Sequence, residues 1–315
     1  GAALGALGGA VIHFNHGRRR VDQVNAAARY PKLEDPGMVK RLSILPLIDW
    51  YTSSDGLAVE PGVSYLVRAD DTTILFDVGF NVHGEHPSPL LLNMEALGVS
   101  LAEIDAIVIS HLHEDHVGGV RQMMQGTFAL SGQPVDLKGK RAYVPVPISN
   151  PTARVRVVHE PRVITPGVAS MGPIPRQMFF YGWTVEQSLA VNVEGKGIVL
   201  IIGCGHPTLP RIIERAEMLF EEPIYGVIGG LHYPVTASRV MKFGIPMQSI
   251  SCTGKLPWKP INRRDVAANI AFLQRRNPQL VSLSPHDSCD WSVEAFRSAF
   301  GEAYRELRVG ETIPV

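Results

Sequence analysis

The sequence predicts an α/β fold in which two β-sheets pack face to face and helices cover their outer faces. Strand signals prevail in the first part of the chain, and strand and helix signals alternate afterwards, which fits this layered arrangement. A length of 315 residues and a hydrophobic content of 45% are enough for one large core. The order of the elements and the composition therefore indicate one large domain.

The first part of the chain contains several short β-rich runs. Residues 42–48 and 63–78 are rich in β-branched side chains, and the turn Ala69-Asp70-Asp71 divides the second run. Apolar side chains recur at helical spacing over residues 89–97, which predicts a short amphipathic helix. We expect a buried strand over 105–110 and further short strands, with prolines between them, at 141–146, 155–164 and 177–193.

Strands and helices alternate over the rest of the chain. The predicted order is a buried strand over 197–202, a helix over 209–220, a strand over 224–228, a helix over 261–274, a strand over 280–283 and a helix over 291–300. His206, His232 and His286 each follow one of these strands. Because functional residues often lie on loops held by rigid strands, we expect these histidines to gather at one edge of the fold.

The strand predicted over 105–110 leads directly into the segment Ser110–Gly119, which reads SHLHEDHVGG. Three imidazoles and a carboxylate within six residues do not suit a packed core, because each polar group costs several kcal/mol to bury without a partner. A metal ion supplies that partner, and neutral imidazole and carboxylate are ligands that zinc prefers. The segment therefore predicts a metal site.

The spacing of these residues favours two ions. His111 and His113 alternate along the extended end of the strand, so their side chains point the same way. Asp115 and His116 come after the chain turns and can face a second position nearby. A paired site of this kind lowers the pKa of a bound water toward about 7 and holds the attacking and leaving oxygens of a hydrolytic reaction.

The segment Ser110–Gly119 resembles the His-x-His-x-Asp-His signature of the metallo-β-lactamase superfamily. Other runs resemble that superfamily in the expected order: Thr73–Gly79, Gly203–His206, Gly229–His232 and Ser284–His286. Glu60–Ser64 and Asn93–Val99 are similar to a narrower branch, which includes the dihydropterin-aminobenzene-phosphate synthase-like metal-dependent hydrolases. The resemblance extends over residues 40 to 315.

This resemblance implies a fold and a set of ligands. The fold is a four-layer αβ/βα sandwich, the metallo-β-lactamase fold, formed by residues 39–315 as one catalytic domain. The first ion is expected to bind His111, His113 and His206, and the second to bind Asp115, His116 and His286. Zinc is the expected metal, as one or two ions, and Mn²⁺ and Fe²⁺ are alternatives.

The chain departs from the superfamily pattern at one ligand. Most members with two ions bridge them with an aspartate between the positions of His206 and His286, but residues 223–264 contain no aspartate. His232 in this stretch is a metal ligand, a hydrogen-bond donor or general acid toward substrate, or an ordinary loop histidine. We expect Asp115 and His232 to be the catalytic side chains and the second ion to bind more weakly. Cys204 is expected to be a small buried thiol beside the site rather than a ligand.

Residues 234–264 are basic and rich in proline and glycine. They contain six lysines and arginines and no acidic residue before Asp265. The stretch lies between two of the histidine segments, so it is interpreted either as a lid that attracts an anionic substrate or as a solvated loop. The resemblance to the phosphate-related branch favours the lid.

The predicted function is a hydrolase that uses a metal-bound hydroxide on an anionic or phosphate-containing small molecule. A lactonase or β-lactam hydrolase and a metal-binding protein without turnover are the alternatives. A formal net charge of zero argues against a general nucleic-acid partner, and three cysteines indicate no disulfide scaffold.

Residues 1–38 form a separate N-terminal segment. Residues 1–14 are apolar and small, and three arginines follow at 18–20. Fourteen residues are too few to span a bilayer, which needs about twenty. Two interpretations stay open: the end of a membrane anchor on a cytoplasmic protein, or a helix packed on the domain or on another subunit.

Overall fold

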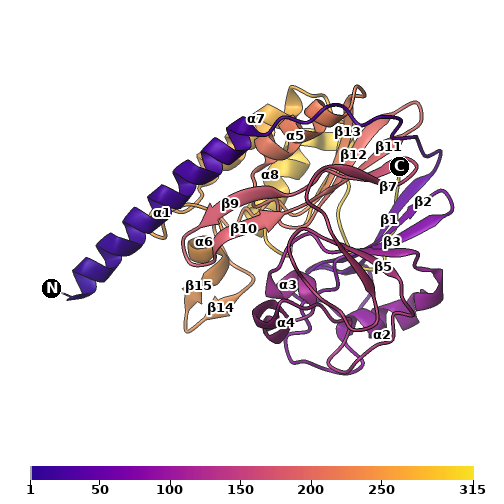
Figure 1. Ribbon diagram of the computed structural model, residues 1–315, viewed down its shortest axis with the longest axis horizontal. Helices are drawn as coiled ribbons and strands as arrows, with labels where there is room; N and C mark the ends of the chain where they lie inside the picture. The colour runs from indigo at the N-terminus through magenta and orange to yellow at the C-terminus, as the bar shows by residue number, and fades with distance from the viewer. Residues whose placement is uncertain (1) are drawn as a thin grey trace.

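The computed structural model describes residues 2–315, and its core is built from two mixed β-sheets (Figure 1). The first sheet has seven strands in the order β17-β1-β2-β3-β4-β5-β6. Strands β1, β2 and β3 are antiparallel, whereas β3, β4, β5 and β6 run parallel. The bounds are β1 Leu42–Ile48, β2 Ser64–Ala69, β3 Thr72–Phe76, β4 Ala106–Val108, β5 Arg141–Val144, β6 Arg154–Val157 and β17 Ile313–Pro314.

The second sheet has six strands in the order β16-β13-β12-β11-β8-β7. Its strands β12, β13 and β16 are parallel, and β7, β8, β11 and β12 pair as antiparallel neighbours. The bounds are β7 Arg162–Thr165, β8 Val168–Ser170, β11 Leu189–Val193, β12 Gly197–Ile202, β13 Ile224–Gly229 and β16 Leu280–Leu283.

Alternate side chains of each strand enter different hydrophobic layers. Ile201 of β12 and Ile228 of β13 belong to the cluster between the sheets, together with Val108 of β4. Their neighbours Leu200 and Val227 face the opposite way, into the cluster beneath the outer helices. The period of two along a strand therefore lets one buried strand serve two cores.

Helices cover the outer face of each sheet, so the four-layer αβ/βα sandwich predicted from the sequence is confirmed (Figure 1). The helix α2 packs against the first sheet, and α5, α7 and α8 cover the second. The helices and short 3₁₀ turns of the domain are α2 Pro89–Ala96, α3 Glu114–Val117, α4 Val120–Gln125, α5 Leu209–Leu219, α6 Met247–Ser251, α7 Arg263–Gln274, α8 Asp290–Phe300, η1 Leu101–Glu103 and η2 Gly301–Ala303.

Two glycines let the ends of β12 and β13 come close together. A Cβ on Gly229, where φ is +119°, would lie 2.0 Å from the carbonyl oxygen of Ile202. A Cβ on Gly230 would lie 2.1 Å from the carbonyl oxygen of Gly203. Only glycine fits such a close approach. The loops after these two parallel strands therefore leave the sheet side by side.

The prediction of one strand over 177–193 was wrong, because the chain turns twice there. Residues Ile174–Met178 (β9) and Gly182–Glu186 (β10) form a separate antiparallel hairpin, and β11 follows in the second sheet. Gly182 has φ of +70° and provides the turn, while the apolar residues Phe179 and Phe180 obscure it in the sequence. Residues 155–164 likewise divide into β6 and β7, with Pro161 between them.

The N-terminal segment forms one long helix, α1 (Ala2–Ala27), whose later half packs on the β9–β10 hairpin while its start projects from the domain (Figure 1). Phe14 is buried with its ring centroid 5.4 Å from that of Phe179, whereas Ile12 is 72% exposed. Asn25 Nδ2 donates to the carbonyl oxygen of Pro175. Among the residues described, no helix has the length and apolar character needed to cross a membrane.

Replacing Phe14 with alanine is expected to detach α1 from the hairpin. The lost burial should cost about 3 kcal/mol or more, because large-to-small changes in a packed site also leave a cavity. The matched control Ile12→Ala, on the same helix but exposed, should change the free energy of unfolding by less than about 0.5 kcal/mol. Urea unfolding and limited proteolysis within residues 2–27 measure both, and equal behaviour of the two variants would contradict the packing described.

Candidate metal centre

The three imidazoles predicted to hold the first ion lie together at the edge of the sandwich where β4 and β12 end. The ring centroid of His111 is 4.5 Å from that of His113 and 4.8 Å from that of His206. His206 Nε2 and His113 Nδ1 are 3.1 Å apart. All three side chains are buried. The structure therefore brings together nitrogen atoms from two strand ends that are about ninety residues apart in the sequence.

The residues predicted to hold the second ion lie beside the first set. Asp115 Oδ2 is 3.5 Å from His116 Nε2, and the His116 and His286 ring centroids are 5.5 Å apart. The thiol of Cys204 lies among them, with Sγ 3.1 Å from His116 Nε2 and 3.3 Å from His286 Nε2. The ligand atoms of these four residues all lie within 4.8 Å of one another. Cys204 is thus buried, as predicted, but in direct contact with the proposed ligands.

The donor atoms of this cluster fit a metal ion. Within the described part of the chain, His111 Nε2 and His206 Nδ1 are buried and have no hydrogen-bond partner. A buried polar atom without a partner costs about 1–3 kcal/mol, and a cation bound by the imidazole nitrogens would remove that cost at His111. Burial also lowers the pKa of His113 to about 4 and that of His206 well below its usual range, which keeps both in the neutral form that binds metals.

A buried carboxylate orients His116. Asp77 Oδ2 lies 2.7 Å from His116 Nδ1, and the same carboxylate accepts the backbone N–H and the hydroxyl of Ser110 at 2.6 Å each. The Nδ1 proton is therefore directed to Asp77, and Nε2 faces the cluster. Burial opposes a charged imidazole, but the carboxylates of Asp115 and Asp77 raise the pKa of His116 well above its usual range.

A serine connects His286 to a second buried carboxylate. Ser284 Oγ donates to Asp49 Oδ2 at 2.6 Å and lies 2.6 Å from His286 Nδ1, so it accepts the imidazole proton. Tyr65 also donates to Asp49, at 2.8 Å, and burial raises the pKa of Asp49 to about 6. Ser110 Oγ likewise lies 2.9 Å from His111 Nδ1 and accepts its proton. In each case Nε2 is left free to face the centre of the cluster.

Glu186 at the end of β10 fixes the loop that carries Cys204 and His206. Its carboxylate accepts three backbone N–H groups, those of Cys204, Gly205 and His206, at 3.1, 2.9 and 2.8 Å. The carboxylate is completely buried, which raises its pKa to about 7 although the three hydrogen bonds oppose the rise. Glu186 was not predicted from the sequence, because it lies among the polar residues Thr184, Gln187 and Ser188 and its three partners lie on another loop.

His232 lies next to the cluster, not in a distant loop. Its ring centroid is 5.0 Å from that of His206, its backbone N–H donates to Asp287 Oδ2 at 2.9 Å, and Nε2 donates to the carbonyl oxygen of Gln248 at 3.2 Å. The ligand atoms of His232, Asp287 and Cys204 lie within 4.8 Å of one another. Asp287 was not predicted, although it directly follows His286.

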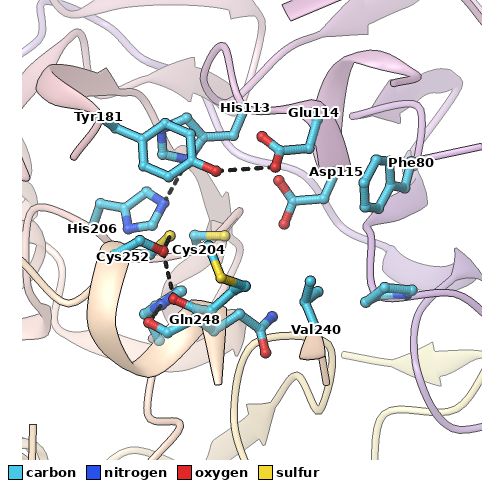
Figure 2. A pocket seen from close by; sticks show the side chains of 14 residues that line it. Phe80, His113, Glu114, Asp115, Tyr181, Cys204, His206, Val240, Gln248 and Cys252 are labelled. Carbon is cyan, nitrogen blue, oxygen red and sulfur yellow. Dashed lines mark hydrogen bonds between the residues drawn. The ribbon is translucent and has the colours of Figure 1, made fainter. Parts of the chain in front are cut away.

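A pocket opens onto the cluster (Figure 2). It is lined by His113, Asp115, Cys204, His206 and His232 together with the side chains of Phe80, Glu114 and Tyr181. Tyr181, in the turn of the β9–β10 hairpin, donates to Glu114 Oε1 at 3.0 Å, and its ring lies 4.5 Å from that of His113. The β9–β10 hairpin therefore contributes an aromatic side chain to the wall of the pocket.

The segment 234–264 lines this pocket, but with uncharged side chains. Val240, Met247, Gln248, Ser251 and Cys252 contribute to the wall, and none of the described lining residues is a lysine or arginine. Three of its six basic side chains contact residues outside the pocket. Arg239 pairs with Asp290, Lys255 pairs with Asp265, and Arg263 lies over the ring of Trp291. The segment also contains the short strands β14 (Met241–Lys242) and β15 (Ile245–Pro246).

Replacing Asp77 with asparagine should weaken metal binding without removing a ligand. Loss of the carboxylate that holds His116 Nδ1 is expected to lower the affinity about 10- to 100-fold, as for other residues that orient a metal-binding histidine. Asp105→Asn is the matched control, because Asp105 accepts only the exposed N–H of Thr73. Titration of both folded variants with zinc against a competing chelator measures the effect. Unchanged affinity in Asp77→Asn would contradict the role given to this carboxylate.

Comparisons of the sequence with known proteins match one family model and identify relatives. The model of the metallo-beta-lactamase superfamily matches residues 57–137, which include the segment Ser110–Gly119. Among curated proteins, the 7,8-dihydropterin-6-methyl-4-(beta-D-ribofuranosyl)-aminobenzene-5'-phosphate synthase of Methanocaldococcus jannaschii is 23% identical over 233 residues, 62% of this chain and 79% of that protein. The anti-Pycsar protein Apyc1 of Paenibacillus sp. is 41% identical over 58 residues, 18% of this chain and 20% of that protein.

Two solved structures share the fold. A metal-dependent hydrolase of the beta-lactamase superfamily superposes with a TM-score of 0.60 at 19% identity, covering 87% of this chain and 99% of its own. The metallo-beta-lactamase fold protein YhfI from Bacillus subtilis superposes with a TM-score of 0.51 at 11% identity, covering 88% and 100%. The family model over residues 57–137, these folds and the converging histidines together show that the chain has the metallo-β-lactamase fold and is similar to that superfamily.

Proposed function

We propose that the protein is a metal-dependent hydrolase that acts on an anionic, phosphate-containing small molecule. The observation that carries this proposal is the convergence of two sets of ligand atoms on one pocket. When bound there, a pair of ions would supply Lewis-acid activation of water and of the bond to be cleaved. Zinc suits a set of imidazole, carboxylate and thiol donors, with Mn²⁺ and Fe²⁺ as alternatives.

Each side chain of the cluster has a proposed task. His111, His113 and His206 would hold one ion, and Asp115, His116 and His286 would hold the other. Asp115 also lines the pocket, so its second oxygen can orient a nucleophilic water. His232 lines the same pocket, and because its one proton is directed from Nε2 to the carbonyl oxygen of Gln248, its Nδ1 would accept a proton or hydrogen bond there rather than donate one.

Glu114 and Tyr181 line the same pocket and can take part in a second proton transfer. Burial raises the pKa of Glu114, and its Oε2 is buried without a hydrogen-bond partner in the described chain. The Tyr181 hydroxyl holds the other oxygen of this carboxylate. The pair is therefore oriented toward whatever enters the pocket, and we propose that it positions the substrate.

The pocket walls indicate how an anion would be recognised. Since no lysine or arginine is among the described lining residues, the ions and not the segment 234–264 would neutralise a phosphate. Phe80, Tyr181 and Met247 offer apolar surface for an aromatic or aliphatic group next to it. The phosphate in the name of the M. jannaschii relative supports a substrate of this class.

The uncharged walls also support a second candidate, hydrolysis of a lactone or a β-lactam. The ring that is cleaved is uncharged in both substrates, so the uncharged walls of the pocket suit it. A third candidate, a metal-binding protein without turnover, is supported by the absence of an aspartate from residues 223–264. The three differ in what the metal-loaded protein hydrolyses.

The test compares the metal-loaded protein on three substrates: bis-p-nitrophenyl phosphate, an acyl homoserine lactone and a chromogenic β-lactam. We expect turnover of the phosphodiester, lost on chelation and restored by zinc. His111→Ala should lose bound metal and fall to the rate of protein-free buffer, whereas the control His159→Ala, outside the cluster, should keep both. Turnover of the lactone or β-lactam alone would favour the second candidate, and full metal occupancy without any turnover would favour the third.

A further inference from the structure

Cys204 occupies the centre of the cluster. Its Sγ belongs both to the set formed with Asp115, His116 and His286 and to the set formed with His111 and His206, each with all ligand atoms within 4.8 Å of one another. Among the described residues, Asp115 is shared in the same way, because it also forms a set with His111 and His113, but Cys204 belongs to three such sets and Asp115 to two. The thiol is 1% exposed, so its neighbours are the ligands and not solvent.

The fold holds the thiol in this place from three sides. Glu186 fixes the backbone on one side through the three N–H groups of the loop. A Cβ on Gly203 would lie 2.3 Å from Ser110 Oγ, so the loop presses against the segment that carries His111. Gly205 has φ of +67°, and a Cβ there would lie 2.8 Å from the carbonyl oxygen of Gly230. The position of Sγ is therefore determined by the loops after β4, β12 and β13 together.

A site with two ions and this donor set offers two anions for a position between them, the Cys204 thiolate and the Asp115 carboxylate, and the second already lines the pocket. Two dications held closely together repel each other, and a shared anion reduces that repulsion. Residues 223–264 provide no aspartate for this purpose. Asp287 does not replace it, because its carboxylate forms a set only with His232 and Cys204 and accepts the backbone N–H of His232.

We propose that the Cys204 thiolate bridges the two metal ions, in the place where a carboxylate would otherwise lie. Sulfur has lone pairs for two ions, and zinc binds thiolate well. On binding, the S–H bond breaks, its proton passes to solvent or buffer, and two metal–sulfur bonds form. The inference rests on the proposed metal-dependent function, but it can fail independently of it.

Cadmium NMR of the protein loaded with two equivalents of Cd²⁺ tests the bridge directly. A thiolate ligand moves a cadmium resonance far downfield of the region for nitrogen and oxygen ligands, so each ion reports its own ligands. We expect two resonances, both downfield, and both should move upfield in Cys204→Ser. The control is Cys252→Ser, because Cys252 lines the same pocket but belongs to no set of possible ligands among the described residues.

These outcomes distinguish a failure of the proposed bridge from a failure of the proposed function. An upfield movement of only one resonance would make Cys204 a terminal ligand, and no movement would remove it from the site; either result overturns the bridge and leaves the hydrolase proposal in place. Failure of the wild-type protein to bind any Cd²⁺ or Zn²⁺ would overturn the proposed function first. Circular dichroism of metal-free Cys204→Ser verifies folding, and Cys204→Ala is the second variant should the serine variant not fold.

Discussion

The main constraint on this fold is a group of buried, titratable side chains that have little solvent around them. Six of the predicted ligands come from three loops, and burial alone would make most of these groups costly. Hydrogen bonds to fixed acceptors offset part of this cost. His116 Nδ1 donates to Asp77, and His286 Nδ1 donates to Ser284, which in turn donates to Asp49. The inner nitrogens then converge, and His111 Nε2 is left without a partner among the described residues. A cation is the partner that completes this arrangement.

The layers of the sandwich provide the rigidity that such convergence requires. Strands β4, β12 and β16 are buried throughout and β13 is buried except at Tyr225, so their ends are held firmly and the loops after them have little freedom. The pair Gly229-Gly230 lets two of these loops run in contact. Glu186 comes from the β9–β10 hairpin outside both sheets and ties that hairpin to the Cys204–His206 loop. Since α1 packs on the same hairpin, the N-terminal helix and the candidate centre are supported by one element.

Local patterns predicted much of this, and long-range contacts account for most of what was missed. The density of histidines after a buried strand indicated the cluster, and strand context identified His206 and His286. Glu186 and Asp49 act through hydrogen bonds to residues distant in the sequence. Glu186 lies 20 residues from His206, and Asp49 lies 235 residues from Ser284. Local sequence patterns do not predict contacts at these separations. Cys204 looked like a small buried residue because its contacts to His116 and His286 exist only in the folded chain. The charge of segment 234–264 was clear, but its pairing with Asp290 and Asp265 was not.

We propose that the loops after β4, β12 and β16 form one centre for two ions. Anomalous X-ray diffraction at the zinc absorption edge, on crystals of zinc-loaded protein, tests it most directly. Two neighbouring anomalous peaks are expected, one among His111, His113 and His206 and the other among Asp115, His116 and His286. Peaks elsewhere on the molecule, or none at the cluster in fully loaded crystals, would contradict it.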